Sequence, residues 1–204
     1  MKECLANWKD YRPGDFVGVE GSGFLTVASY AIFKPPTYLF HFLTIRARLE
    51  EEDDYEIIEM RTDGCKIGRL SWYLDHAFVV FRLNDPEVDA LGKRAAKYAS
   101  RFGRAPYDYR LFFKLPFACL KCWLKQLLYE HWLRRIDPAE LDISWDTIFV
   151  CTELPKAIWL QVSKNAIGPK DVGIPAAYKK SYLAKRIRIV GWNIPKESRV
   201  KFLP

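Results

Sequence analysis

A chain of 204 residues can bury a sizeable core, and half of its residues are hydrophobic, so the composition indicates a globular protein rather than a disordered one. The net charge of +7 favours anionic surfaces such as nucleic acid, acidic lipid or cell-wall polymer, without choosing among them. The N-terminus lacks the apolar core of a signal peptide, and no stretch approaches the roughly 20 apolar residues that span a bilayer. We therefore expect a soluble protein, cytoplasmic or associated with a virus or phage.

The five cysteines are odd in number and irregularly spaced, which argues against a disulfide framework. Cys119 and Cys122 form a C-x-x-C pair, but no second pair and no histidine at zinc-finger spacing follows. We interpret both as structural thiols in preference to a redox or metal site.

The first predicted strand covers Phe16 to Val19, after a turn. A helix is predicted from Phe24 to Phe33, and the preceding Gly21-Ser22-Gly23 is interpreted as a turn because no Lys-Ser/Thr signature of a phosphate loop follows it.

The strand predicted at 38–47 carries His41. With a period of two, His41 shares one face with Leu39, Leu43 and Ile45. Taken alone, a histidine on an apolar face is more often a hydrogen-bonded core residue than a catalyst.

An acidic turn at 49–54 precedes a strand at 55–60, which predicts a hairpin with the preceding strand. Glu56 and Glu59 lie on opposite faces of the second strand. If the face of Ile57 is the inward one, Glu59 is a buried carboxylate that needs a partner, and Glu56 is the solvated one.

The remaining predicted elements are a turn with a short connection at 63–70, a strand at 78–83, helices at about 87–102 and 176–183, and a strand at 186–190. The apolar, basic and Trp-rich segment 111–136 predicts one or two amphipathic helices. Such helices could suit a membrane surface, although packing on the domain with solvated lysines is the favoured interpretation.

Cys151 lies between an apolar run and a predicted helix. Leu154 and Ile158 follow helical spacing, and Pro155 is tolerated only near a first turn, so the helix should begin within a residue or two of Cys151. The free N–H groups and dipole of a helix start favour a thiolate there. Taken alone, such a cysteine is most often a small buried hydrophobe.

Three windows, in this order, resemble the circularly permuted branch of the NlpC-type papain-like superfamily, the YiiX/YebB-like cysteine hydrolases. They are Gly14-Asp15-Phe-Val with the strand bearing His41, then Tyr55-Glu-Ile-Ile-Glu59-Met before a turn, then Gly103-Arg-Ala-Pro-Tyr107-Asp ahead of Phe149-Val-Cys151-Thr-Glu-Leu. The resemblance covers about 13–190 of a single domain, 1–204, and leaves 191–204 as a basic tail. It implies an α+β fold with helices packed on an antiparallel sheet and a helical insertion at about 110–146.

By this resemblance Cys151 is the nucleophile, His41 holds its thiolate as an ion pair and later protonates the leaving group, and Glu59 orients the other ring nitrogen. The backbone N–H of Cys151 is a natural oxyanion donor. Tyr107 is a candidate for lining or polarising the site, or else an ordinary loop aromatic.

Two other histidines are rival bases. His76 directly precedes a predicted strand and is the more credible of the two, whereas His131 lies on the amphipathic segment, where an interfacial role is favoured.

The leading hypothesis is a cysteine hydrolase that cleaves an amide bond, in a cell-wall peptide or an N-acyl substrate, through a thioester acyl-enzyme. A lipid acyltransferase or thioesterase of the same fold, which could reach an anionic membrane through 111–136, and a non-catalytic structural module are the alternatives. None of the three requires a metal or an organic cofactor, and no motif predicts a specific nucleic-acid partner.

Overall fold

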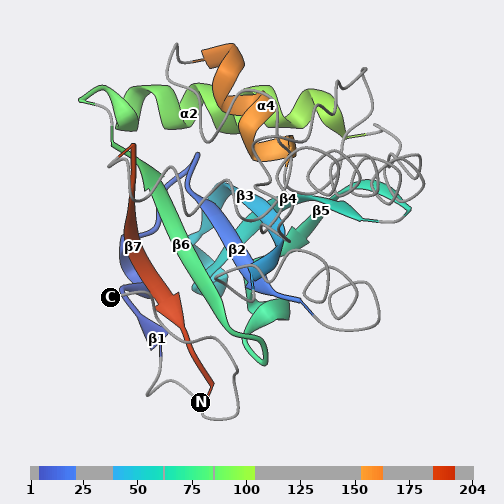
Figure 1. The fold of residues 1–204 in the computed structure, drawn as a ribbon, viewed down its shortest axis with the longest axis vertical. Helices are drawn as coiled ribbons and strands as arrows, with labels where there is room; N and C mark the ends of the chain where they lie inside the picture. The colour runs from blue at the N-terminus through green and yellow to red at the C-terminus, as the bar shows by residue number, and fades with distance from the viewer. Residues whose placement is uncertain are drawn as a thin grey trace, which may run out of the picture.

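A seven-stranded sheet, in which every neighbouring pair is antiparallel, forms the centre of the computed structural model (Figure 1). The structure describes residues 5–21, 39–61, 63–84, 86–103, 153–162 and 186–195. The strands are β1 (Leu5–Ala6), β2 (Phe16–Glu20), β3 (Leu39–Leu49), β4 (Asp54–Arg61), β5 (Gly64–Arg69), β6 (Phe78–Leu83) and β7 (Ile187–Asn193). Their order across the sheet is β1-β7-β6-β2-β3-β4-β5.

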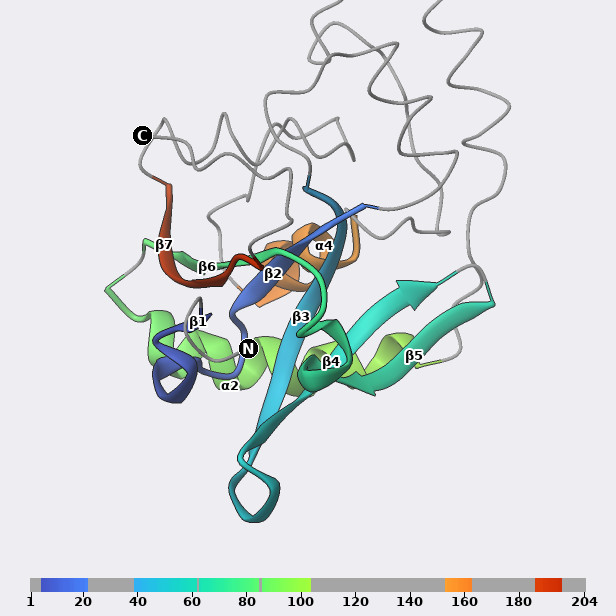
Figure 2. The ribbon, with the colours of Figure 1, turned by 90° about the horizontal axis from the view of Figure 1, so that it is seen from below.

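The described helices are α2 (Val88–Ala99) and α4 (Glu153–Val162), with short 3-10 turns η2 (Trp8–Asp10), η3 (Glu50–Glu52), η4 (Leu70–Tyr73) and η5 (Ser100–Phe102). Five predicted strands are confirmed, those at 16–19, 38–47, 55–60, 78–83 and 186–190. The helix predicted at 87–102 is also confirmed, and its final turn is a 3-10 helix. The β3–β4 hairpin is also as predicted, and it extends away from the helices with η3 at its tip (Figure 2). The α+β class with an antiparallel sheet is therefore correct.

The turn predicted at Asp63-Gly64 is present, but the interpretation of 66–70 as a short connection was wrong. After the turn, residues from Gly64 to Arg69 pair along β4 as the edge strand β5. Two glycines and two basic residues in six positions give this segment little strand propensity of its own, so pairing with β4 decides its conformation.

β3 carries a bulge next to His41. Val19 pairs with His41, whereas Glu20 pairs with Leu39, so one residue of β3 has no pairing partner in β2. Leu39 consequently packs on the opposite face from Leu43. The predicted common face of His41 and Leu39 was wrong, and the predicted common face with Leu43 holds.

Each face of the sheet carries its own hydrophobic cluster, as the alternation along β4 illustrates. Ile58 and Met60 belong to the cluster that includes α2 and α4, whereas Tyr55 and Ile57 belong to the cluster that includes Leu70 of η4. We call these the helix face and the η4 face.

The helices reach the sheet through close backbone contacts. A Cβ added at Gly14, whose φ is +92°, would lie 2.5 Å from Cα of Gly92 in α2, so only glycines permit this approach. Trp159 of α4 is buried and donates its indole N–H to the Gly14 carbonyl at 2.9 Å. The turn before β2 therefore holds both helices.

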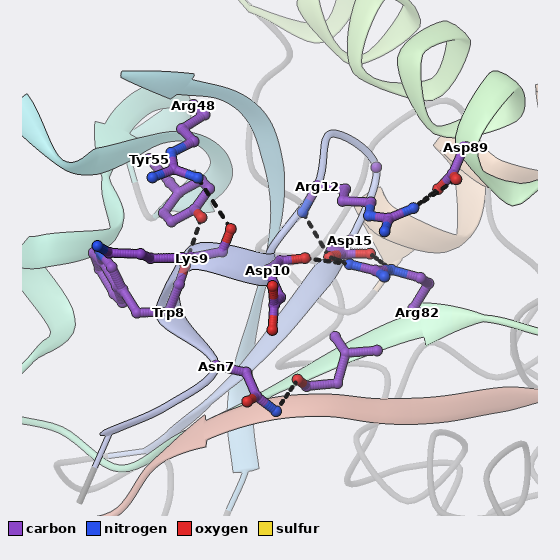
Figure 3. A network of polar contacts seen from close by, with 12 residues as sticks. Asn7, Trp8, Lys9, Asp10, Arg12, Asp15, Arg48, Tyr55, Arg82 and Asp89 are labelled. Atoms are coloured by element: carbon purple, nitrogen blue, oxygen red, sulfur yellow. Dashed lines mark hydrogen bonds and ion pairs between the residues drawn. The ribbon is translucent and has the colours of Figure 1, made fainter. Parts of the chain in front are cut away.

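A polar network ties the same turn to β6 and α2 (Figure 3). Arg82 donates from Nε and from a terminal nitrogen to the two carboxylate oxygens of Asp15, both at 2.7 Å, and also to the carbonyl of Asp10. Arg12 pairs with Asp89 at the surface.

Within the described ranges no helix combines the length and apolar character that crossing a membrane requires.

Candidate active site at the His41–Glu59 pair

Neighbouring strands of the predicted hairpin bring His41 and Glu59 together. Leu43 is the register partner of Glu59, and His41 is the next residue along β3 on the same face. The distance from His41 Nε2 to Glu59 Oε2 is 2.7 Å, which is a charge-assisted hydrogen bond. The Glu59 side chain is fully buried and that of His41 is 25% exposed, so the pair has one protected end and one end open to solvent.

Tyr73 completes the site from the end of η4. Its hydroxyl donates a short hydrogen bond to Glu59 Oε2, the same oxygen that faces His41. The His41 and Tyr73 rings lie 6.0 Å apart between centroids and are tilted by 32°. Sequence analysis did not single out Tyr73, because an aromatic residue 14 positions beyond the glutamate in a 3-10 turn belongs to no motif.

The second carboxylate oxygen of Glu59 is less well bonded. Oε1 is buried and accepts no hydrogen bond within the described part of the chain, and Arg61 approaches it only to 3.9 Å. It faces Gly68 on β5, where an added Cβ would lie 3.2 Å from Oε1 and 2.8 Å from Cζ3 of Trp72. Gly68 thus leaves room for both the carboxylate and the indole.

Hydrogen bonding decides the ionisation of Glu59. Burial by itself raises the pKa of the carboxyl, but the hydrogen bonds from His41 and Tyr73, with the nearby charges of His41 and Arg61, together hold its pKa below the ordinary value. Glu59 is therefore a carboxylate at neutral pH and can only accept, so His41 Nε2 carries the proton in this bond.

Of the sequence-predicted residues, the structure brings His41 and Glu59 together, and the predicted burial and partnering of Glu59 are confirmed. The partly exposed Glu56 pairs with Arg46 on the other side of the strand. Several predicted residues and segments lie outside the described residues. They are Cys151, Tyr107, His131, Cys119 and Cys122, with the segments 24–33, 104–146 and 176–183.

The rival base His76 has a different environment. Its ring lies 6.2 Å from that of Tyr73, and its backbone carbonyl accepts a hydrogen bond from Asn193. No carboxylate within the described ranges forms an ion pair with it, so His76 lacks the acidic partner that His41 has.

A described thiol lies on the neighbouring strand, on the other face of the sheet from the pair. Cys65 on β5 is buried, and burial together with the charge of Glu59 raises the pKa of this thiol to about 11. Such a thiol is protonated at neutral pH and is a poor nucleophile.

The helix predicted to follow Cys151 is confirmed as α4, whose first described residue is Glu153. Leu154, Ile158 and Trp159 pack in the helix-face cluster, whereas His41 and Glu59 project from the η4 face. The described part of α4 is therefore on the other face of the sheet from the pair.

No family model and no curated protein matches the chain. The fold is that of an α+β protein of the YiiX type. Among solved structures it is similar to the metalloprotein yiiX from Escherichia coli O157:H7, with a TM-score of 0.59 and 15% sequence identity over 90% of this chain and 98% of that one. The likeness to YiiX expected from the sequence is thus confirmed for the fold.

Proposed function

We propose that the chain is a cysteine hydrolase of amide bonds with the permuted papain-like fold of the NlpC-type superfamily, in which Cys151 is the nucleophile and His41 and Glu59 are its base and orienting residue. The observation that carries the proposal is the 2.7 Å bond between His41 Nε2 and Glu59 Oε2 in a chain of YiiX-like fold. A fully buried carboxylate that orients a partly exposed imidazole is the arrangement that a thiol nucleophile needs beside it.

The bond assigns a role to each ring nitrogen. Because Nε2 is bonded to Glu59, Nδ1 is the atom that exchanges a proton with the nucleophile. The Cys151 thiol gives its proton to Nδ1 and its sulfur bonds to the carbonyl carbon. The imidazolium then returns the proton to the leaving amine as the C–N bond breaks and a thioester remains. Water, deprotonated by His41, hydrolyses the thioester and restores the thiol.

The proposal makes a geometric demand. Since the described part of α4 packs on the helix face and the pair lies on the η4 face, the residues before Glu153 must carry the thiol past the end of β3 to reach His41. A His41→Cys variant tests this with a short bifunctional thiol crosslinker, because an imidazole reaches farther than a cysteine side chain and leaves the two sulfur atoms farther apart than a disulfide requires. Crosslinking between position 41 of the variant and Cys151 is expected, and no crosslink with the short reagent would contradict the proposal.

The yiiX structure is described as a metalloprotein. In this chain, no three histidine, cysteine or carboxylate side chains gather as a metal-binding group within the described ranges, and the Glu59 oxygen nearest His41 is already shared by two hydrogen bonds. Among the described residues the His41–Glu59 pair supplies too few ligands for a metal centre, and the proposed reaction is written without a metal-dependent step.

The activity test compares two cysteines of the same chain. Cys151→Ala should abolish hydrolysis across a panel of cell-wall peptides and N-acyl amides, whereas Cys65→Ala, which removes a buried protonated thiol, should retain it. In wild-type protein, Cys151 should react with iodoacetamide faster than it does in denatured protein. A Cys151→Ala variant that remains active would overturn the proposal, and an unreactive Cys151 would favour a non-catalytic module.

A lipid acyl substrate, for an acyltransferase or thioesterase of the same fold, is supported by one observation. Trp72 is 58% exposed, and its indole lies over Gly68 beside the Glu59 carboxylate. An exposed apolar side chain next to a reactive pair would suit an acyl chain. Binding to anionic vesicles at low salt that Trp72→Ala weakens would favour this substrate, and no binding would leave the peptide or amide substrate as the choice.

A further inference from the structure

Tyr73 contacts both members of the pair on which the proposed function rests. Its hydroxyl donates to Glu59 Oε2, and its ring lies against that of His41. Oε2 also receives the 2.7 Å hydrogen bond from His41 Nε2, so the Tyr73 hydroxyl and the His41 ring both donate to the same oxygen atom.

The 3-10 turn that carries Tyr73 is anchored independently of the pair. Asp54, the first residue of β4, is buried and accepts hydrogen bonds from the Ser71 N–H at 3.1 Å and from the Ser71 hydroxyl at 2.6 Å. Leu70, at the other end of η4, is fully buried in the η4-face cluster. The start of β4 thus positions η4 over the end of the same strand, where Glu59 lies.

The two hydrogen bonds account for the lone pairs of Oε2 and define the orientation of the carboxylate. A carboxylate oxygen accepts about two hydrogen bonds, so Tyr73 and His41 together occupy Oε2. With Oε1 accepting none among the described residues, the Tyr73 hydroxyl is the second of the two contacts that fix the Glu59 carboxylate. Without it, the bond to His41 alone would hold the carboxylate, which could then tilt and carry the imidazole with it.

We propose that Tyr73 is a positioning residue: its hydroxyl holds the Glu59 carboxylate in the orientation that receives His41 Nε2, and so keeps the imidazole aligned for proton exchange with the nucleophile. This inference deepens the proposed function and depends on it for the identity of the nucleophile. The same hydroxyl also withdraws charge from Oε2, in agreement with its part in lowering the pKa of Glu59.

The test compares Tyr73→Phe with Tyr55→Phe in the full chain. Tyr55 is buried on the same face, but its hydroxyl donates to the backbone carbonyl of Trp8, so its loss removes a structural hydrogen bond without touching Glu59. The Glu59 carboxyl is titrated by carbon-13 NMR in both variants. An upward shift of its pKa in Tyr73→Phe but not in Tyr55→Phe is expected, and no difference between the two variants would overturn the inference.

A second measurement tests whether Tyr73 affects the reactivity of Cys151. The rate of Cys151 alkylation by iodoacetamide should fall about tenfold or more in Tyr73→Phe, the effect of losing a hydrogen bond to a charged group, with a changed pH profile. In a Glu59→Gln background the same substitution should change the rate less than about twofold, since the hydroxyl acts through the carboxylate. An equal fall in both backgrounds would overturn the positioning role.

The two readouts separate the two proposals. If Cys151 is unreactive in wild-type protein while the Glu59 titration still shifts, the proposed function fails and the bond network stands. If Cys151 is reactive and Tyr73→Phe changes neither readout, the positioning role alone fails. Should Tyr73→Phe not fold, a 3,5-difluorotyrosine at position 73 is the substitute. This more acidic donor should lower the pKa of Glu59 further, and an unchanged titration would overturn the inference.

Discussion

Two buried pairs of charged or titratable groups in the same sheet differ in how completely they are bonded. In the Asp15–Arg82 pair both carboxylate oxygens receive arginine N–H groups, one also receives the Arg12 N–H, and the side chains are 2% and 7% exposed. In the His41–Glu59 pair one oxygen receives two donors, the other receives none among the described residues, and the imidazole is 25% exposed.

The difference separates a structural pair from one suited to chemistry. A fully bonded pair closed off from solvent cannot change its protonation without losing several hydrogen bonds, so it only holds elements together. A pair with a partly exposed imidazole and an under-bonded carboxylate is better suited to proton exchange at the imidazole. The predictions below test this contrast.

The largest effect on folding is expected from Arg82→Met. It leaves the Asp15 carboxylate buried without its partner, so the free energy of unfolding should fall by about 3–5 kcal/mol in urea denaturation. The matched control is Arg12→Met, which breaks the exposed pair with Asp89 and should cost less than about 1 kcal/mol. Equal losses in the two variants would show that the Asp15–Arg82 pair is not the structural one.

The largest effect on chemistry is expected from His41→Ala. Loss of the proposed base should slow the alkylation of Cys151 and any hydrolysis by about 100- to 10,000-fold. It also leaves the buried Glu59 carboxylate without its His41 partner, so the free energy of unfolding should fall as well, and both rates are measured under conditions in which the variant is folded. His76→Ala, which removes a histidine without an acidic partner in the described part of the chain, should change both rates less than about twofold. If the two variants were equally slow, the base would have to be reassigned.

A smaller effect is expected from Gly68→Ala. The added methyl would lie 2.8 Å from Trp72 and 3.2 Å from the under-bonded oxygen of Glu59, so both side chains must move, at a cost of about 1–3 kcal/mol in thermal or urea unfolding. Gly103→Ala is the control, because its nearest neighbour would be at an ordinary 3.4 Å. A Gly68→Ala variant as stable as the control would mean that Glu59 and Trp72 are loosely held.

The smallest effect is a pH dependence of stability. The pKa of Glu59 is lower in the folded protein than in the unfolded chain, so its contribution is fully present above the unfolded pKa and is lost as the pH falls through the folded pKa. Wild-type protein should therefore lose stability on acidification below about pH 4.3, the ordinary pKa of a glutamate, more steeply than Glu59→Gln does. Parallel curves would show that the pair does not stabilise the ionised carboxyl.

Local periodicity was enough to predict most of the described strands and the hairpin that carries His41 and Glu59. Alternating apolar residues and an acidic turn identify the β3–β4 hairpin, and the hairpin alone brings His41 near Glu59, because antiparallel register is a local property of a short connection. The burial of Glu59 followed from the same alternation.

Features that depend on contacts between distant segments were missed. β5 has weak strand propensity and forms by pairing with β4, and the bulge that moves Leu39 to the helix face arises from the pairing of β3 with β2. Tyr73 reaches Glu59 because Asp54 anchors η4, a contact between segments that no spacing in the sequence encodes.

The sequence by itself determined the hairpin and the face of Glu59, since these follow from side-chain alternation over a few residues, whereas the α+β class and the choice of Glu59 as the partner of His41 were predicted from the family resemblance. Only the tertiary structure decided that Tyr73 joins the pair, that His76 does not gain a carboxylate within the described ranges, and that α4 packs on the other face of the sheet from His41. The physical reason is that alternation specifies which face a side chain takes, whereas the neighbours it meets there come from segments whose approach is set by packing the whole sheet.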